Sequence, residues 1–168
     1  MKVHDAGRLS GSVYLAAGLS LVYLLSVQLL PLPAPAARAE MLEASRLMAR
    51  ATRAVGECRD AKGIRLDPEA DPNGTGLIGL ERSPITTSLG SLEAKRTAAN
   101  PNFAGLVAAL LRAAGVRAGD AVAVGASSSF PAFIIAALSA AEAMDVEPIV
   151  ISSLGSSEWG ANIPEFHT

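Results

Sequence analysis

Residues 121–152 read AVAVGASSSFPAFIIAALSAAEAMDVEPIVIS, and this stretch decides the fold. It begins and ends with short apolar runs, at 121–125 and 148–152, of the kind that forms buried parallel strands. The apolar residues between the runs recur at helical spacing, and the three serines at 127–129 stand where a helix cap is expected. Strand, helix and strand in this order predict a right-handed βαβ unit, and hence an α/β fold with a partial, Rossmann-like parallel sheet.

Two further helices and a strand are expected before this unit. Residues 103–114 carry an amphipathic helical pattern that Gly115 ends, and Ser91 can cap a short helix at 92–96. A run of turn-forming residues at 66–76 leads into the apolar residues 77–80, which we interpret as a short strand.

A long amphipathic helix is expected at residues 37–60. Its apolar positions follow a heptad spacing, formed by Met41, Ala44, Met48, Ala51, Val55 and Cys58. The seam is shorter than the three to four heptads that a coiled coil needs. The helix is therefore either a stalk that joins copies of the chain or a helix packed on its own domain.

Residues 12–32 contain no charged side chain and are long enough to span the hydrocarbon core of a bilayer. We expect a transmembrane anchor here, with a short cytoplasmic tail at 1–11 and a single-pass protein in the cell membrane. The alternative is a cleaved signal peptide, because Ala37-Arg38-Ala39 resembles a cleavage site. A connector that contains prolines and the long helix then occupy residues 33–62, and an α/β domain that we expect to be incomplete occupies residues 63–168. We expect that domain to be extracytoplasmic.

Composition excludes several classes of function. The chain has 14 basic and 16 acidic residues, a formal net charge of -2 and no long basic run, so nucleic acid is not an expected partner. Its single cysteine, Cys58, rules out an intrachain disulfide and a multi-cysteine metal site. The sequence lacks phosphate-binding and dinucleotide-binding motifs, so we expect no cofactor. The Asp-, Asn- and Gly-rich run at 66–76 suggests a calcium loop but lacks the EF-hand spacing and the closing Glu, so we expect no metal.

Hydroxyl groups follow both predicted strands at the sheet edge where α/β proteins bind ligands. They belong to Ser127, Ser128 and Ser129 after the first strand and to Ser152 and Ser153 at the end of the second. A third segment, with Thr86 and Thr87, can converge with them, and Arg82, Lys95 and Arg96 can supply positive charge. The segments form either a pocket for a carboxylate or phosphate, or ordinary caps and turns.

A serine nucleophile is a weaker alternative. Residues 125–129, GASSS, depart from the nucleophile-elbow motif because Ser129 replaces its second glycine. Ser127 or Ser128 would need His167 as the base, since it is the only histidine after the apolar segment.

Five segments together resemble the bacterial poly-γ-glutamate system protein family. They are GLIG at 76–79, SPITTSLGSLEAKRT at 83–97, NPNFA at 100–104, VGASSSFP at 124–131 and ISSLGSSEWGAN at 151–162. The resemblance implies an accessory membrane protein of the machinery that makes or exports γ-linked polyglutamate. It implies no catalytic residue, and it implies a longer chain than this one.

Three hypotheses of function follow. The chain binds the anionic polymer, its γ-glutamyl ends or the synthase subunits; or it is a membrane-anchored serine-type γ-glutamyl hydrolase or transferase; or it is a scaffold that forms homo-oligomers through residues 37–60.

Overall fold

The computed structural model describes residues 11–29 and 37–167 of the 168-residue chain. The chain divides into two compact units, Met1–Ala36 and Ala37–Thr168, which we describe separately. The described residues form five helices and two small parallel sheets, so the α/β class is confirmed.

The first unit contains helix α1, Gly11–Leu29, whose large apolar side chains from Val13 to Leu25 are exposed. Across the ranges 11–29 and 37–167, no helix has the length and apolarity needed to cross a membrane. The transmembrane helix predicted at 12–32 is thus not supported by the described residues. Residues 30–32 of that prediction, and the prolines of the predicted connector, lie outside them.

In the second unit, the long helix expected at 37–60 is α2, Arg38–Ala61. Its apolar stripe packs against α4, Asn102–Ala113, and α5, Pro131–Ala143. Met48 and Ala44 are buried in this three-helix layer. The structure therefore favours the packed helix over the stalk, because most of the heptad seam packs in the core of its own domain, namely Met41, Ala44, Met48 and Val55. Cys58, at the end of the seam, is exposed.

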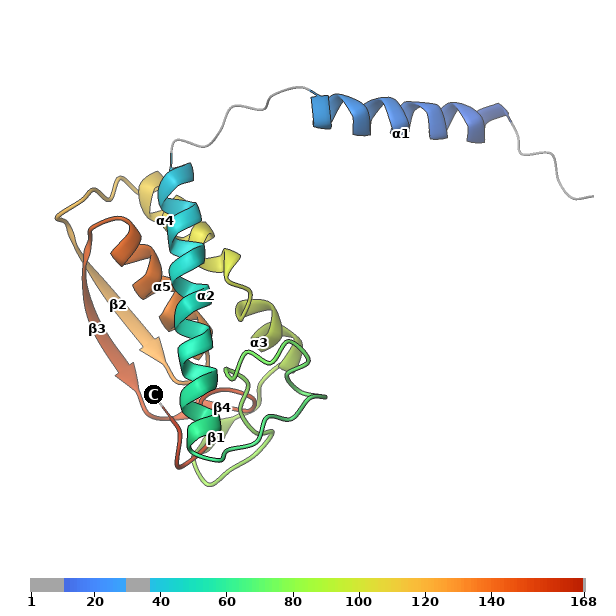
Figure 1. Ribbon diagram of the computed structural model, residues 1–168. Coiled ribbons are helices and arrows are strands. Elements are labelled where there is room, and N and C mark those ends of the chain that lie inside the picture. The colour runs from blue at the N-terminus through green and yellow to red at the C-terminus, as the bar shows by residue number, and fades with distance from the viewer. Residues whose placement is uncertain (1–10, 30–36, 168) are drawn as a thin grey trace, which may run out of the picture. The chain divides into compact units, whose positions relative to one another are not determined.

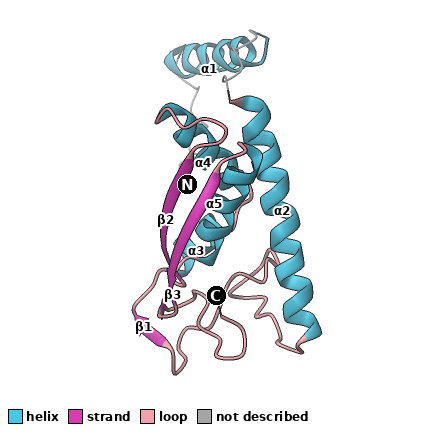
Figure 2. Ribbon diagram, turned by 90° about the vertical axis from the view of Figure 1, so that its left-hand side faces the viewer, coloured by secondary structure: helices cyan, strands magenta, loops and turns pink. Residues whose placement is uncertain are grey.

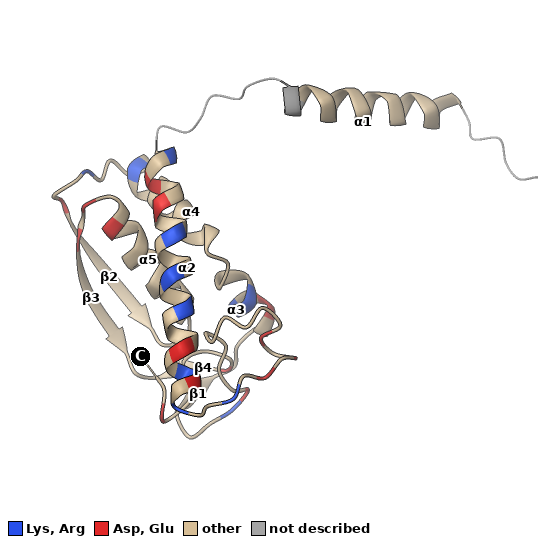
Figure 3. Ribbon diagram, in the orientation of Figure 1, with Lys and Arg blue, Asp and Glu red and all other residues tan. Residues whose placement is uncertain are grey.

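Small residues allow α2 and α4 to pack closely. A Cβ atom at Gly105 would lie 2.8 Å from the Met41 carbonyl oxygen and 2.8 Å from Ser45 Oγ. At the other side of the layer, Ala136 and Ala140 of α5 are fully buried in the same core. Charged residues gather along α2, whereas β2 and most of β3 carry none (Figure 3).

The predicted βαβ unit is present. Strands β2, Ala121–Ser127, and β3, Glu147–Ser153, are parallel and pair from Ala121↔Glu147 to Ser127↔Ser153, with α5 between them in sequence. The helical layer covers one face of this sheet, and α5 lies between the sheet and α2 (Figures 1 and 2).

The other face of the β2–β3 sheet is uncovered among the described residues, contrary to the prediction of fully buried strands. Ile151 is 77% exposed and Ile149 is 56% exposed. In most parallel sheets, a continuous apolar run belongs to a strand that is covered on both faces. Here the helices pack on only one face of the sheet.

Two local predictions were wrong. The serines at 127–129 do not cap α5, because its N-cap is Phe130, which makes no side-chain cap bond, and Pro131 opens the helix. Residues 77–80 are not a strand; the second sheet instead pairs β1, Thr86–Ser88, with β4, Ser156–Ser157. The expected cap of α3, Leu92–Ala98, is present, since Ser91 Oγ accepts a hydrogen bond from Ala94 N–H.

Candidate functional site

Three segments meet beyond the carboxyl ends of β2 and β3, and we call them the loop hub: residues 80–90, 127–129 and 153–162. The sequence placed hydroxyl groups in each segment, and the structure brings them into contact. Two parallel strands end at the same sheet edge, so the loops that follow them are neighbours.

The serines of the loop hub bond to one another and to backbone groups. Ser128 is fully buried, and its Oγ donates to the Ser153 carbonyl oxygen at 2.7 Å. Ser156 Oγ donates to the Ser128 carbonyl oxygen at 3.1 Å, and Ser129 Oγ accepts from the Ser157 N–H at 3.0 Å. These hydroxyls hold the loops together, in place of the helix capping that the sequence suggested.

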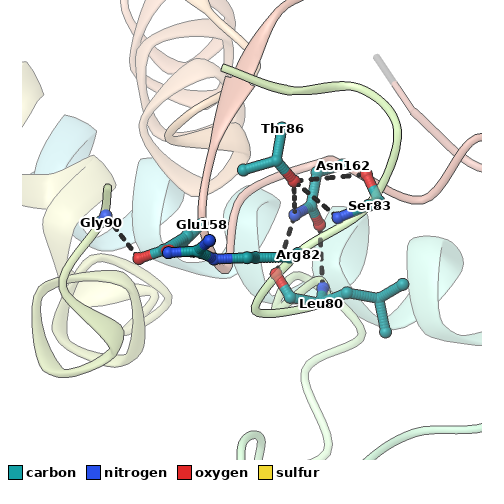
Figure 4. Close-up of polar contacts among 7 residues, drawn as sticks. All are labelled: Leu80, Arg82, Ser83, Thr86, Gly90, Glu158 and Asn162. Carbon is teal, nitrogen blue, oxygen red and sulfur yellow. Dashed lines mark hydrogen bonds and ion pairs between the residues drawn. The ribbon is translucent and has the colours of Figure 1, made fainter. Parts of the chain in front are cut away.

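Asn162, near the C-terminus, links the hub segment 153–162 to the segment 80–90. Its side chain is fully buried, accepts from the Leu80 N–H at 2.8 Å and donates to the Leu80 carbonyl oxygen at 2.7 Å. It also donates to Thr86 Oγ1 at 2.9 Å, and that oxygen accepts from the Ser83 N–H as well (Figure 4). One amide side chain thus satisfies both the N–H and the carbonyl oxygen of Leu80, as the backbone of a neighbouring strand would.

Lys95 lies beneath the hub, although it belongs to α3. It is 3% exposed, its Nζ donates to the Ser129 carbonyl oxygen and to Ser157 Oγ at 2.7 Å, and it lies 3.8 Å from the centre of the Phe130 ring. No carboxylate of the described residues lies within ion-pair distance of it. Burial lowers the pKa of Lys95 to about 8.

A hollow of about 300 Å³ opens at the surface of the hub, and we call it the Arg82 hollow. Its lining consists of Arg82, Ser83, Thr86, Thr87, Ser88, Leu89 and Glu158. Arg82 Nε donates to Glu158 Oε1 at 3.1 Å, and the other carboxylate oxygen accepts from the Gly90 N–H at 3.1 Å (Figure 4). The Arg82 side chain is 74% exposed and that of Glu158 only 10%, so the carboxylate is fixed while the guanidinium faces solvent.

The predicted site residues separate into those inside the hub and those outside it. Thr86 and Thr87 line the Arg82 hollow, and Thr87 Oγ1 also donates to the Ser156 carbonyl oxygen at 3.1 Å. Ser127 and Ser153 belong to the hub segments but are exposed at the strand ends, and Ser152 lies just outside the hub, on β3.

Two predicted residues lie elsewhere. Arg96 donates to the carbonyl oxygens of Glu69 and Ala70 and lines a separate polar hollow beside α2. His167 lines an apolar cavity that includes neither Ser127 nor Ser128. Linear sequence could not show this, because both residues are placed by contacts between distant segments.

Sequence reasoning placed Ser156 and Ser157 in the hydroxyl-rich segment after the second strand, but it missed Asn162 and Glu158 as members of the hub. Their only signal was their place in the segment at 151–162 that carries the family resemblance. Their partners lie far away in sequence: Asn162 and Leu80 are separated by 82 positions.

Comparisons with protein-family models, with curated proteins and with solved structures gave no match to this chain.

The buried ammonium of Lys95 predicts a specific pH dependence of stability. Its pKa is about 8 in the folded chain against an ordinary value of 10.5. Between these two values the unfolded chain binds more protons than the folded chain, so the free energy of unfolding rises with pH. Below pH 8 both states are protonated, and the cost of burying the charge is present in full.

We expect the stability of the wild type, measured relative to a Lys95→Met variant, to increase from pH 8 to pH 10.5 in urea unfolding. Lys62→Met, which removes an exposed lysine, is the control. The stability of the wild type relative to Lys62→Met should not change with pH over this range. A flat difference between wild type and Lys95→Met across this range would show that Lys95 keeps its ordinary pKa.

Proposed function

We propose that this chain is a single-pass membrane accessory component of poly-γ-glutamate synthesis or export, and that the Arg82 hollow binds carboxylates of the polymer. The observation that supports the binding site is the pair of Arg82 and Glu158. A glutamate carboxylate already lies between the Arg82 guanidinium and the Gly90 N–H. The polymer presents the same chemical group on every residue.

The geometry leaves donors for a second carboxylate. Among the described residues, Arg82 is bonded to Glu158 through Nε alone, so the two terminal nitrogens of its planar fork remain to bind a ligand. The exposed side chain of Ser88 lines the same hollow and adds a hydroxyl donor. Lys95, which is held beneath the hub by Ser157 and Ser129, adds positive charge.

A repeating polymer suits a shallow site of this kind. A single exposed ion pair contributes little to affinity, but each γ-glutamyl unit carries one carboxylate, so neighbouring units rebind before the chain leaves. The uncharged residues 12–32 would hold the domain at the membrane where the polymer emerges, close to the synthase subunits.

Direct binding tests this function. In calorimetry with a γ-linked glutamate oligomer, we expect saturable binding by the full chain that weakens as salt is added. Arg82→Gln should reduce affinity about tenfold, because it removes a charged hydrogen-bond donor. Arg117→Gln removes the same charge from an exposed turn outside the hollow and should leave affinity unchanged. The proposal fails if the wild type does not bind, or if the two variants bind equally.

A second candidate function, a serine-type γ-glutamyl hydrolase or transferase, is favoured by one contact. Lys95 Nζ lies 2.7 Å from Ser157 Oγ, and a lysine with a lowered pKa can act as a general base. Lys95 would take the hydroxyl proton as Oγ bonds to the γ-carbonyl carbon, and it would return that proton to the amine that leaves when the amide C–N bond breaks. Water, or an acceptor amine in a transferase, would then attack the same carbon and lose a proton to Lys95, which returns it to Ser157 Oγ as the ester bond breaks. Ser157 replaces Ser127 and Ser128 as the candidate nucleophile, because its hydroxyl contacts a lysine base, whereas His167 shares no cavity with either of the other two serines.

Covalent labelling distinguishes the enzyme from the binding protein. If the chain is a serine hydrolase, a fluorophosphonate should label the wild type and a Ser127→Ala variant but not Ser157→Ala. Absence of label on the wild type above pH 8, where Lys95 is neutral, would exclude this second function and leave the binding proposal untouched.

A further inference from the structure

The Arg82 hollow carries two opposite charges in direct contact. Arg82 and Glu158 are the charged members of its lining, and the other members are hydroxyl-bearing residues and Leu89. Arg82 Nε lies 3.1 Å from Glu158 Oε1 (Figure 4), and the formal charge of the lining is therefore zero. Such a lining favours a ligand group that carries both signs of charge over a group that is only anionic.

Both charged groups keep unused hydrogen-bonding positions. Among the described residues, the terminal nitrogens of Arg82 make no bond. The Glu158 carboxylate accepts one hydrogen bond at each oxygen, from Arg82 Nε and from the Gly90 N–H. An ionised carboxylate has about four lone-pair positions, so each oxygen can accept one more donor. The Glu158 side chain is 10% exposed and belongs to the lining, so a donor in the hollow can reach it.

The backbone holds Glu158 in place before any ligand binds. Its N–H donates to the Ser88 carbonyl oxygen at 3.0 Å. Its own carbonyl oxygen lies so close to Gly90 that a Cβ atom there would clash with it. Because the carboxylate is already ordered, a ligand that bonds to it loses little additional side-chain entropy.

An α-amino acid group matches this pair of charges. It carries an ammonium and a carboxylate on one carbon atom, so its two charges are also adjacent. Its carboxylate can bind the planar fork of the Arg82 terminal nitrogens, and its ammonium can donate to Glu158. Hydrogen bonds between charged groups are about twice as strong as those between neutral groups.

We propose that the Arg82 hollow recognises the amino-terminal end of the γ-linked polymer, with the α-carboxylate against Arg82 and the α-ammonium against Glu158. This inference rests on the proposed polymer-binding function and names the unit that binds most tightly. An internal unit also has an α-carboxylate, but its nitrogen belongs to an amide and carries no charge. Internal units therefore bind Arg82 alone.

Three ligands separate the amino end from internal units and from free amino acids, which share its chemistry. We would titrate the full chain by calorimetry with a γ-linked glutamate oligomer, with the same oligomer acetylated at its amino end, and with free glutamate. Acetylation removes the ammonium and keeps every carboxylate, so it should weaken binding at least about tenfold. Free glutamate lacks the carboxylates of the following units and should bind more weakly than the free-ended oligomer.

A pair of variants assigns the ammonium to Glu158. Glu158→Gln removes the negative charge and keeps the size of the side chain, so it should bind the two oligomers equally. Glu142→Gln removes the same charge from an exposed position of α5 outside the hollow, and it should keep the preference of the wild type.

Equal binding of the two oligomers by the wild type would overturn the amino-end assignment without reliance on any variant, and polymer binding through Arg82 would stand. The same preference in Glu158→Gln as in Glu142→Gln would overturn the role of Glu158. Free glutamate that binds as tightly as the free-ended oligomer would overturn the polymer end as the ligand. Absence of binding by both oligomers would overturn the polymer-binding function itself.

Discussion

Replacement of Asn162 by alanine is expected to lower the free energy of unfolding by about 2–4 kcal/mol, since buried polar groups left without partners cost about 1–3 kcal/mol each. The substitution removes the acceptor of the Leu80 N–H and the donors to the Leu80 carbonyl oxygen and to Thr86 Oγ1. Because Asn162 is fully buried, water replaces these bonds only after the loops move apart. The loss should therefore open the hub as well as destabilise it.

Urea unfolding followed by Trp159 fluorescence measures this change. Asn73→Ala, at an exposed position in the loop before β1, is the matched control and should stay within about 0.5 kcal/mol of the wild type. If Asn162→Ala is as stable as Asn73→Ala, the side chain of Asn162 does not hold the hub closed.

Replacement of Gly79 by alanine is expected to have a comparable effect through a steric clash. A Cβ atom at this position would lie 1.9 Å from the Gly160 carbonyl oxygen and 2.3 Å from Asn162 Oδ1. The Gly160 oxygen belongs to the backbone, so the segment around it has to shift. Overpacking of this kind costs about 1–3 kcal/mol, and more where backbone must move.

Thermal unfolding should register this cost as a decrease in Tm of roughly 10 °C. Gly125→Ala is the control, because a Cβ atom there meets nothing within 4 Å and the residue lies in regular strand β2. A Gly79→Ala variant with the melting temperature of Gly125→Ala would contradict the close contact between residues 79 and 160.

Local sequence patterns predicted the helices and the main strands because the pattern of each element lies within that element. The apolar spacing along residues 37–60 became α2, and the two apolar runs became β2 and β3. The same patterns could not show which strand face is covered. Ile149 and Ile151 are as apolar as core residues, yet both are exposed, since burial depends on which helices pack nearby.

The closeness of the serines in the candidate site could be predicted from the topology of the sheet. Parallel strands end at one sheet edge, so the serines after β2 and β3 had to be neighbours. The sequence could not show that Ser128 and Ser156 bond to backbone carbonyl oxygens of the hub. It also could not show that Glu158 lies against Arg82, 76 positions earlier.

The fold removes the simplest test of the scaffold hypothesis, which is a charged substitution on the heptad seam. Met48 lies on the heptad seam, where a charged substitution would test self-association in a free stalk. In the structure Met48 is fully buried among α2, α4 and α5, so a charge there would unfold the domain and report nothing about oligomers.

The central claim is that the polymer binds at the Arg82 hollow, and the most direct test is to map the residues that the polymer contacts. Backbone amide resonances of the isotope-labelled full chain would be followed by NMR during titration with a γ-linked glutamate oligomer. We predict saturable shifts of Ser88, Gly90 and Glu158 around the Arg82 hollow, with Ala136 and Ala140 in the buried core of α5 unchanged. Saturable shifts confined to residues outside the loop hub, or no shifts at any oligomer concentration, would contradict the account.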